Sequence, residues 1–121
     1  MTRVHARCGT IADMDDDGWL TNAEDELLGP LEDSPLPLWE IRGGHVTTGR
    51  LEAYLVPGLT SLAARGLIEV RRFDGWPQSW DRGSPMAGED LLRYCRRLDA
   101  WSPGATPVLA AHITPEGRRC L

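Results

Sequence analysis

The sequence predicts an α+β domain in which short helices precede an antiparallel pair of strands. The strongest evidence lies in residues 46–72, whose leucines recur at the spacing of one helical face (Leu51, Leu55, Leu59 and Leu62). Gly66 stands where a left-handed residue would end that helix. Residues 67–73 follow without a linker and are rich in β-branched and aromatic side chains, as in a strand. A chain of 121 residues is long enough for one hydrophobic core and one domain.

Capping and turn residues mark the helices that come before this stretch. Residues 21–24 (T-N-A-E) have the spacing of a capping box, which predicts the start of a first helix. Residues 36–41 suit a second short helix, and the glycine pair at 43–44 suits the turn after it. The third helix would then run from Thr47 to Arg65, so that three helices joined by tight turns lead into the strand.

A long insertion separates this strand from its expected partner. Residues 74–88 predict a loop rich in glycine, proline and tryptophan, and residues 89–101 have the apolar spacing of a further amphipathic helix. Residues 108–113 predict the returning strand. The expected organisation is therefore a flexible acidic arm (residues 1–18) followed by one domain (residues 19–121) with an insertion (residues 74–106).

Two phrases resemble those of winged helix-turn-helix regulators of the PadR and MarR type. Residues 55–68 (L-V-P-G-L-T-S-L-A-A-R-G-L-I) are similar to the recognition-helix pattern of PadR-like proteins, with Val56 where that family has tyrosine. Residues 113–118 (I-T-P-E-G-R) are similar to the phrase that closes the second wing strand in both families. The resemblance implies a winged helix: a three-helix helix-turn-helix core and a two-stranded antiparallel wing, here with an extra helix inserted between the wing strands.

For function, the resemblance implies a cytoplasmic regulator of bacterial type that binds double-stranded DNA and regulates transcription, with homodimerisation left open. Polar side chains occupy the start of the third helix, where a recognition helix first meets DNA (Thr47, Thr48, Arg50, Glu52 and Tyr54). Two arginines of the first strand would lie on phosphates (Arg71 and Arg72). The alternative is that Arg50 and Glu52 are ordinary surface residues and that Tyr54 is partly buried.

Net charge separates the two halves of the chain. The total is −5, which is unfavourable for a general nucleic-acid binder. Residues 1–40 hold ten carboxylates and two arginines, a balance of −8, whereas residues 41–121 hold eight carboxylates and eleven arginines, a balance of +3. The half that resembles a winged helix is thus the basic half, which is compatible with DNA binding.

A second hypothesis is a winged-helix module that binds a protein partner and no DNA. Trp76 and Trp80 flank a proline in the inserted loop, and an exposed pair of aromatic side chains there would mark a protein interface. The inserted helix would contribute to the same surface. Its arginines (Arg93, Arg96 and Arg97) form a basic face, which is more typical of a solvated surface than of a DNA contact.

Residues 13–24 fit the EF-hand loop pattern D-x-D-x-D-G-x5-E. The calcium ligands would be three carboxylates, one backbone carbonyl, one hydroxyl and a bidentate carboxylate (Asp13, Asp15, Asp17, Trp19, Thr21 and Glu24). The competing interpretation is a solvated acidic segment, because the capping box already explains Thr21 and Glu24 and no second loop is present. Calcium is a minor alternative, and no other cofactor is expected.

Other functions find little support in the sequence. The cysteines (Cys8, Cys95 and Cys120) form no C-x-x-C pair and predict free thiols in a reducing cytoplasm, and H-x2-C with H-x7-C (His5, Cys8, His112 and Cys120) matches no known zinc spacing. No nucleophile–base arrangement or phosphate loop is present, so we do not expect an enzyme. Residues 1–12 lack a secretory h-region, and no apolar run approaches the ~20 residues of a membrane span.

Overall fold

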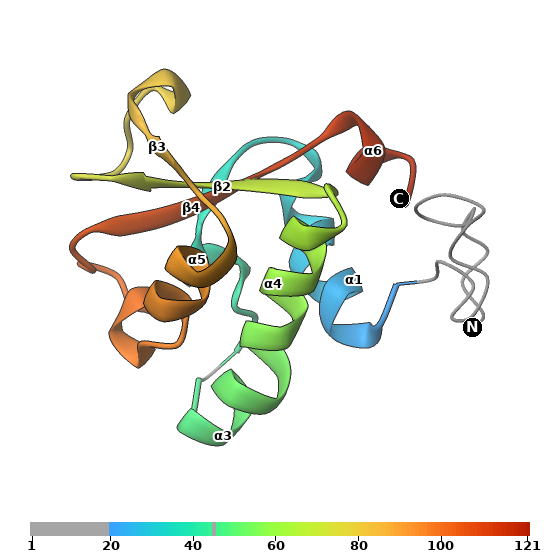
Figure 1. Cartoon of the computed structure of the whole chain (residues 1–121), viewed down its shortest axis with the longest axis horizontal. Coiled ribbons are helices and arrows are strands. Elements are labelled where there is room, and N and C mark those ends of the chain that lie inside the picture. The colour runs from blue at the N-terminus through green and yellow to red at the C-terminus, as the bar shows by residue number, and fades with distance from the viewer. Residues whose placement is uncertain (1–19, 45) are drawn as a thin grey trace.

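The computed structural model describes residues 20–44 and 46–121, which form a mixed α+β domain (Figure 1). In chain order its elements are α1 (Asn22–Leu28), η1 (Gly29–Glu32), β1 (Leu36–Pro37), α2 (Leu38–Ile41), α3 (Thr48–Arg50), the π-helical turn η2 (Leu51–Leu55), α4 (Val56–Ala64), β2 (Ile68–Phe73), η3 (Trp80–Arg82), β3 (Ser84–Met86), α5 (Gly88–Cys95), η4 (Leu98–Trp101), β4 (Val108–Ile113) and α6 (Pro115–Arg118). Figure 1 shows α4 between α1 and α5, with the sheet above them, and α4 packs against both helices.

The strands form one antiparallel sheet in the order β1-β4-β2-β3. In its central pair, Ile68 on β2 lies opposite Ile113 on β4, and the register continues to Phe73 opposite Val108. The pairing of these two segments is predicted from the sequence and is confirmed. Alternate β2 residues such as Val70 join the main core with the leucines of α4, whereas Phe73 belongs to a smaller cluster with Val108.

The expectation of a two-stranded sheet is wrong, because the described chain adds a strand at each edge. Leu36 and Pro37 pair with β4 as β1, in a segment assigned to the second helix from the sequence. Pro37 has an extended backbone (φ −71°, ψ 160°) and precedes the first turn of α2, so the helix begins one residue later. Residues 84–86 pair with β2 as β3 although they lie in the expected loop, and this places Met86 in the core.

The third helix is continuous from α3 to α4, but its middle is wider than an α-helix. Pro57 has no N–H, and its ring would clash with the carbonyl of Ala53 in regular α-geometry. The preceding turn is accordingly π-helical, and the amide of Val56 donates to the carbonyl of Leu51. The leucine spacing still places one face of the helix in the core, as expected.

Two glycines determine how this helix packs and ends. At Gly58, an added Cβ would lie 2.9 Å from Cβ of Ala23 and 3.0 Å from Cδ1 of Leu27, so the glycine allows α1 and α4 to cross closely. Gly66 has φ +75°, the left-handed conformation expected at the end of the helix. The chain therefore enters β2 directly after α4.

The inserted helix is shorter than the expected range of residues 89–101. Its regular part, α5, ends at Cys95, and the chain turns before η4. Trp101 explains the turn, because it is fully buried and its indole Nε1 donates to the carbonyl of Cys95 at 2.8 Å. The guanidinium of Arg42 donates to the carbonyl of Trp101 at 2.8 Å and ties η4 to α2.

Of the two cysteines within the described residues, one agrees with the expectation of a free thiol and the other does not. Cys95 is a free, buried thiol, and burial raises its pKa to about 11. Cys120 is disulfide-bonded, which corrects the expectation for that residue. The expectation of a reducing compartment was based on free thiols, and the disulfide at Cys120 removes that support.

Candidate interaction surface

The start of the third helix keeps its threonines at the surface. Thr47 is the N-cap of α3, and its Oγ1 accepts from the amide of Arg50 at 3.1 Å. Thr48 and Glu52 are exposed, and Glu52 makes no hydrogen bond or ion pair with another described residue. These side chains lie where the sequence places them, at the N-terminal end of the third helix.

The guanidinium of Arg50 contacts other residues of the same chain. Its Nη1 donates to the carbonyl of Arg42 at 2.7 Å, and its Nη2 lies 3.5 Å from Oε1 of Glu26. The guanidinium also stacks 5.0 Å from the ring centroid of Tyr54. Burial and a hydrogen bond from its hydroxyl to Glu26 raise the pKa of Tyr54. Two residues expected to contact DNA are thus joined to each other and to an acidic side chain.

Arg71 is also used inside the chain. Its Nε lies 2.9 Å from Oε2 of Glu69, and its Nη1 donates to the carbonyl of Trp80 at 2.7 Å. Its guanidinium lies 5.0 Å from the Trp80 ring centroid. Arg72, the next residue on β2, is exposed. Of the two arginines expected on phosphates, only Arg72 projects freely into solvent.

The expected aromatic interface in the inserted loop is folded onto the sheet. Trp76 and Trp80 are half-buried, and their ring centroids lie 5.0 Å and 5.6 Å from that of Phe73. The ring centroid of Trp80 also lies 5.4 Å from that of His112. The loop therefore covers the sheet face opposite α4, and most of the aromatic surface that was expected to dock a partner is used for this purpose.

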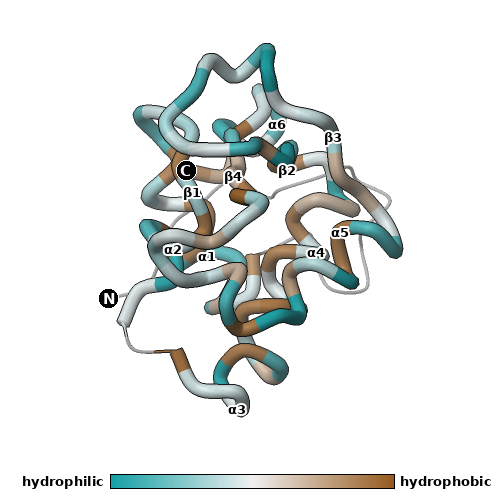
Figure 2. Tube along the Cα trace, turned by 90° about the vertical axis from the view of Figure 1, so that its left-hand side faces the viewer, coloured by the Kyte–Doolittle hydropathy of each residue, from teal (hydrophilic) through white to brown (hydrophobic). Residues whose placement is uncertain are grey.

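The outer side of α4 is the least charged part of the helical surface. Between Glu52 and Arg65 the chain has no ionisable side chain except the tyrosine at position 54. Arg65 turns toward α1, with Nη1 2.9 Å from Oε1 of the buried Glu24. Figure 2 shows hydrophobic stretches of α4 and α5 beside each other, and the two helices pack together. The outer side of α4 (Val56–Ala64) therefore carries no charged side chain of its own.

Hollows lie on both sides of α4. The hollow toward α5 has a volume of about 520 Å³, and that toward α1 has about 480 Å³. Pro57 and Ser61 line both, so α4 forms a ridge between them. We call this ridge, its two hollows and the adjoining residues of α5 the α4–α5 face. Exposed apolar surface that joins several hollows is typical of a binding site.

The hydroxyl groups that line the hollow between α4 and α5 already have hydrogen-bond partners within the chain. Thr60 Oγ1 donates to the carbonyl of Val56 at 2.8 Å, and Ser61 Oγ donates to Oε2 of Glu24 at 2.5 Å. The other residues of this hollow are apolar or small (Pro57, Ala63, Ala64, Ala87, Gly88, Leu91 and Leu92). A specific small-molecule site usually offers a few convergent polar groups, whereas this groove offers apolar contact.

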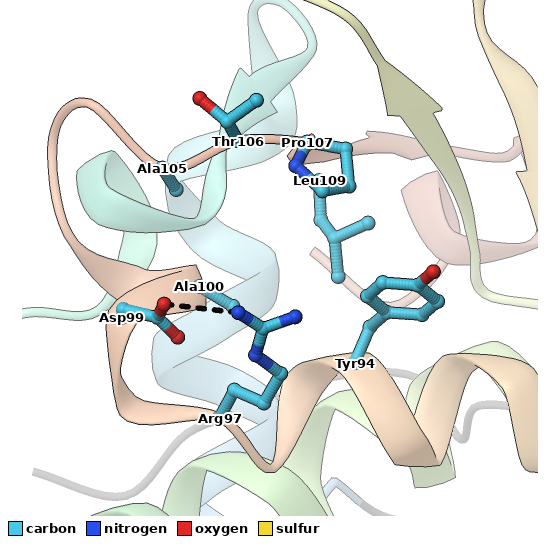
Figure 3. A pocket seen from close by; sticks show the side chains of 8 residues that line it. All are labelled: Tyr94, Arg97, Asp99, Ala100, Ala105, Thr106, Pro107 and Leu109. Atoms are coloured by element: carbon cyan, nitrogen blue, oxygen red, sulfur yellow. Dashed lines mark hydrogen bonds and ion pairs between the residues drawn. The ribbon is translucent and has the colours of Figure 1, made fainter.

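A further hollow lies beside η4 (Figure 3), but it is too small to bind a ligand. Its volume is about 10 Å³, room for at most about one water molecule. Tyr94 and Leu109 project toward it, and Arg97 forms an ion pair with Asp99 at 3.1 Å along its edge. We assign no function to it.

The calcium-loop residues Asp13, Asp15, Asp17 and Trp19 lie outside the described residues. Of the remaining two, Thr21 is the N-cap of α1 and donates its amide to Oε1 of Glu24, as the capping box predicts. Glu24 is 1% exposed and accepts from Ser61 and Arg65 as well. Both of its oxygens therefore have protein partners. Within residues 20–44 and 46–121, no group of three His, Cys, Asp or Glu side chains has the geometry to hold a metal ion.

Comparison with known proteins leaves the chain without an assigned family. No family model, curated protein or solved structure matches it. In the described part of the chain, no helix has both the length and the apolar character to span a membrane.

Sequence reasoning overlooked the α4–α5 face, although one signal was available. The leucine spacing directs attention to the buried side of the helix, but the absence of charge from Ala53 to Ala64 is also visible in the sequence. An exposed helix face without charged residues is unusual for a soluble domain and for a DNA-reading helix. The contribution of Leu92 on α5 depends on tertiary packing and could not be predicted in this way.

Proposed function

We propose that this chain is a winged-helix protein-interaction module without enzymatic activity, and that the α4–α5 face docks on another protein chain. The winged-helix assignment is supported by the passage from α4 through Gly66 into β2 and by the pairing of β2 with β4. In this interpretation β1 is a third strand of the core sheet, while β3, α5 and η4 are the insertion.

The single observation that carries the proposal is the uncharged outer side of α4. Its flanking arginines, Arg50 and Arg65, form ion pairs with Glu26 and Glu24. A DNA-reading helix obtains most of its affinity from basic groups on phosphates. An apolar ridge with hollows instead suits the desolvated centre of a protein interface.

The sheet edges are poor alternatives for docking. The outer strands are short and both contain proline, Pro37 in β1 and Pro85 in β3, and short, proline-containing edge strands discourage the pairing of a further strand. Addition of a partner strand is therefore disfavoured. Docking on the helical face is therefore favoured over strand addition.

DNA binding is the second candidate function. It is favoured by the exposed Arg72 on β2 and by the exposed Thr47 and Thr48 at the start of the third helix. In this candidate the threonines and Arg72 contact phosphates, while Arg50 acts only by positioning the helix through the carbonyl of Arg42.

Site-specific photo-crosslinking in cells tests the choice between these functions. A photoreactive residue is placed at Leu92, with matched exposed positions at Gln78 in the aromatic loop and Ser34 before β1. We expect a protein adduct of one fixed mass at position 92, weak adducts at 78 and 34, and no loss of the adduct on nuclease treatment. Nuclease-sensitive adducts, or equal adducts at all three positions, contradict the proposal.

A further inference from the structure

The α4–α5 face carries a projecting apolar side chain next to an apolar hollow. Leu92 is 38% exposed, although it lines the groove of about 520 Å³. It also lines a smaller hollow of about 210 Å³ with Val56. A surface with a projection and a hollow side by side can pack on a copy of itself about a two-fold axis, because each copy fills the hollow of the other.

The charges beside this patch are also self-complementary. Glu52 and Arg96 line the smaller hollow together with Val56 and Leu92. Neither charged side chain has a hydrogen-bond or ion-pair partner among the described residues. The neighbouring arginines of the same region do have partners: Arg93 lies 3.7 Å from Asp90, and Arg97 lies 3.1 Å from Asp99. One unpaired anion and one unpaired cation therefore flank the same apolar patch.

We infer that the chain seated on the α4–α5 face is a second copy of this one, in an isologous two-fold dimer. Leu92 of each copy enters the apolar hollow of the other, and Glu52 of each copy faces Arg96 of the second copy. The arrangement pairs both unpaired charges at once, as electrostatic complementarity at an interface requires. This inference rests on the proposed protein-docking role and names its partner.

Charge reversal tests the inference through sedimentation analysis of the full chain. We expect the wild type to be dimeric. Glu52→Arg and Arg96→Glu should each weaken the dimer by about 100-fold or more, because like charges then face each other twice per dimer. An equimolar mixture of these two variants should recover the wild-type association, because each reversed charge then meets its opposite.

Two further variants control for folding and for general charge effects. Leu92→Asp should be monomeric with an unchanged circular dichroism spectrum. Arg93→Glu, which alters a neighbouring exposed arginine that has an intrachain partner, should remain dimeric. A monomeric wild type, or single charge reversals that leave the dimer intact, overturns the inference.

The crosslinking experiment separates failure of this inference from failure of the proposed function. A position-92 adduct between two copies of the chain supports the two-fold dimer and the protein-docking role. An adduct with a different protein, together with a monomeric wild type, overturns the second copy as partner and leaves the docking role. Absence of any protein adduct at position 92 overturns both.

Discussion

Arg65 and Glu24 form a partly buried ion pair that joins the end of α4 to the first turn of α1, with Nη1 2.9 Å from Oε1. The same carboxylate accepts from Ser61 Oγ and from the amide of Thr21. Arg65 is the C-cap residue of α4, and this contact directs it toward α1 and away from the outer side of the helix. Glu24 thereby stabilises α1, joins it to α4 and holds Arg65 away from the outer side of α4.

We predict that Glu24→Ala destabilises the domain by about 2–4 kcal/mol, since it removes the carboxylate of the capping box together with its buried ion pair to Arg65. Urea unfolding measures the change. The control is Glu26→Ala, whose carboxylate is 59% exposed and pairs with Arg50 at 3.5 Å. That substitution should cost less than about 1 kcal/mol. Equal effects of the two substitutions would contradict the central position of Glu24.

Gly58→Ala tests the close crossing of α1 and α4. Higher helix propensity favours alanine by about 1 kcal/mol, but a Cβ 2.9 Å from Ala23 requires the helices to move apart. We expect a net destabilisation of about 1–2 kcal/mol in chemical unfolding. In the matched substitution Gly49→Ala, the added Cβ would lie 4.0 Å from Oγ1 of Thr47, so this change should instead stabilise by about 0.5–1 kcal/mol. A stabilising effect of Gly58→Ala would show that α1 and α4 accommodate the added Cβ without moving apart, which would contradict the account.

The buried thiol of Cys95 should make the free energy of unfolding depend on pH in alkaline solution. Burial raises its pKa from 9.0 to about 11, with a nearby backbone hydrogen bond and Arg96 opposing the shift. As pH rises, the thiol of the unfolded chain loses its proton before the thiol of the folded chain does. The stabilisation of the folded state by the protonated thiol is therefore fully present below the unfolded pKa and is lost as pH rises through the folded pKa. We expect a loss of about 2 kcal/mol across that interval. Cys95→Ala should show a flatter profile, and identical profiles would contradict burial of the thiol.

Calcium binding by residues 13–24 requires both oxygens of Glu24, which already accept hydrogen bonds from Thr21, Ser61 and Arg65. We therefore expect no tryptophan-sensitised terbium luminescence and no calcium-dependent shift of the unfolding midpoint. Saturable luminescence that is lost in Asp13→Ala would contradict this expectation. Loss of the same signal in Glu24→Gln would assign the carboxylate to the metal.

The sequence predicts the parts of this fold that depend on local patterns. Leucine spacing, the left-handed Gly66 and the strand that follows identify the third helix and the central strand pair. β1 and β3 are not predictable in this way, because they are two and three residues long and exist only through pairing with longer strands. The turn after Cys95 likewise depends on burial of Trp101, which is a tertiary effect.

The candidate surface shows a similar division. The basic residues of the third helix and β2 are visible in the sequence, but their partners are not. Arg50 and Arg71 pair with Glu26 and Glu69, and only the fold determines that these arginines are held against the chain. Charge in the sequence therefore does not show which arginines are free to contact a partner.

Binding to mixed-sequence duplex DNA, followed by fluorescence anisotropy at about 50 and 200 mM salt, tests most directly whether the outer side of α4 faces protein or DNA. We expect weak or undetectable binding at both concentrations, and no change in Arg50→Ala or Arg71→Ala. Tight binding that weakens by about 10³-fold or more between the two concentrations, and that either substitution reduces, would contradict the protein-docking role.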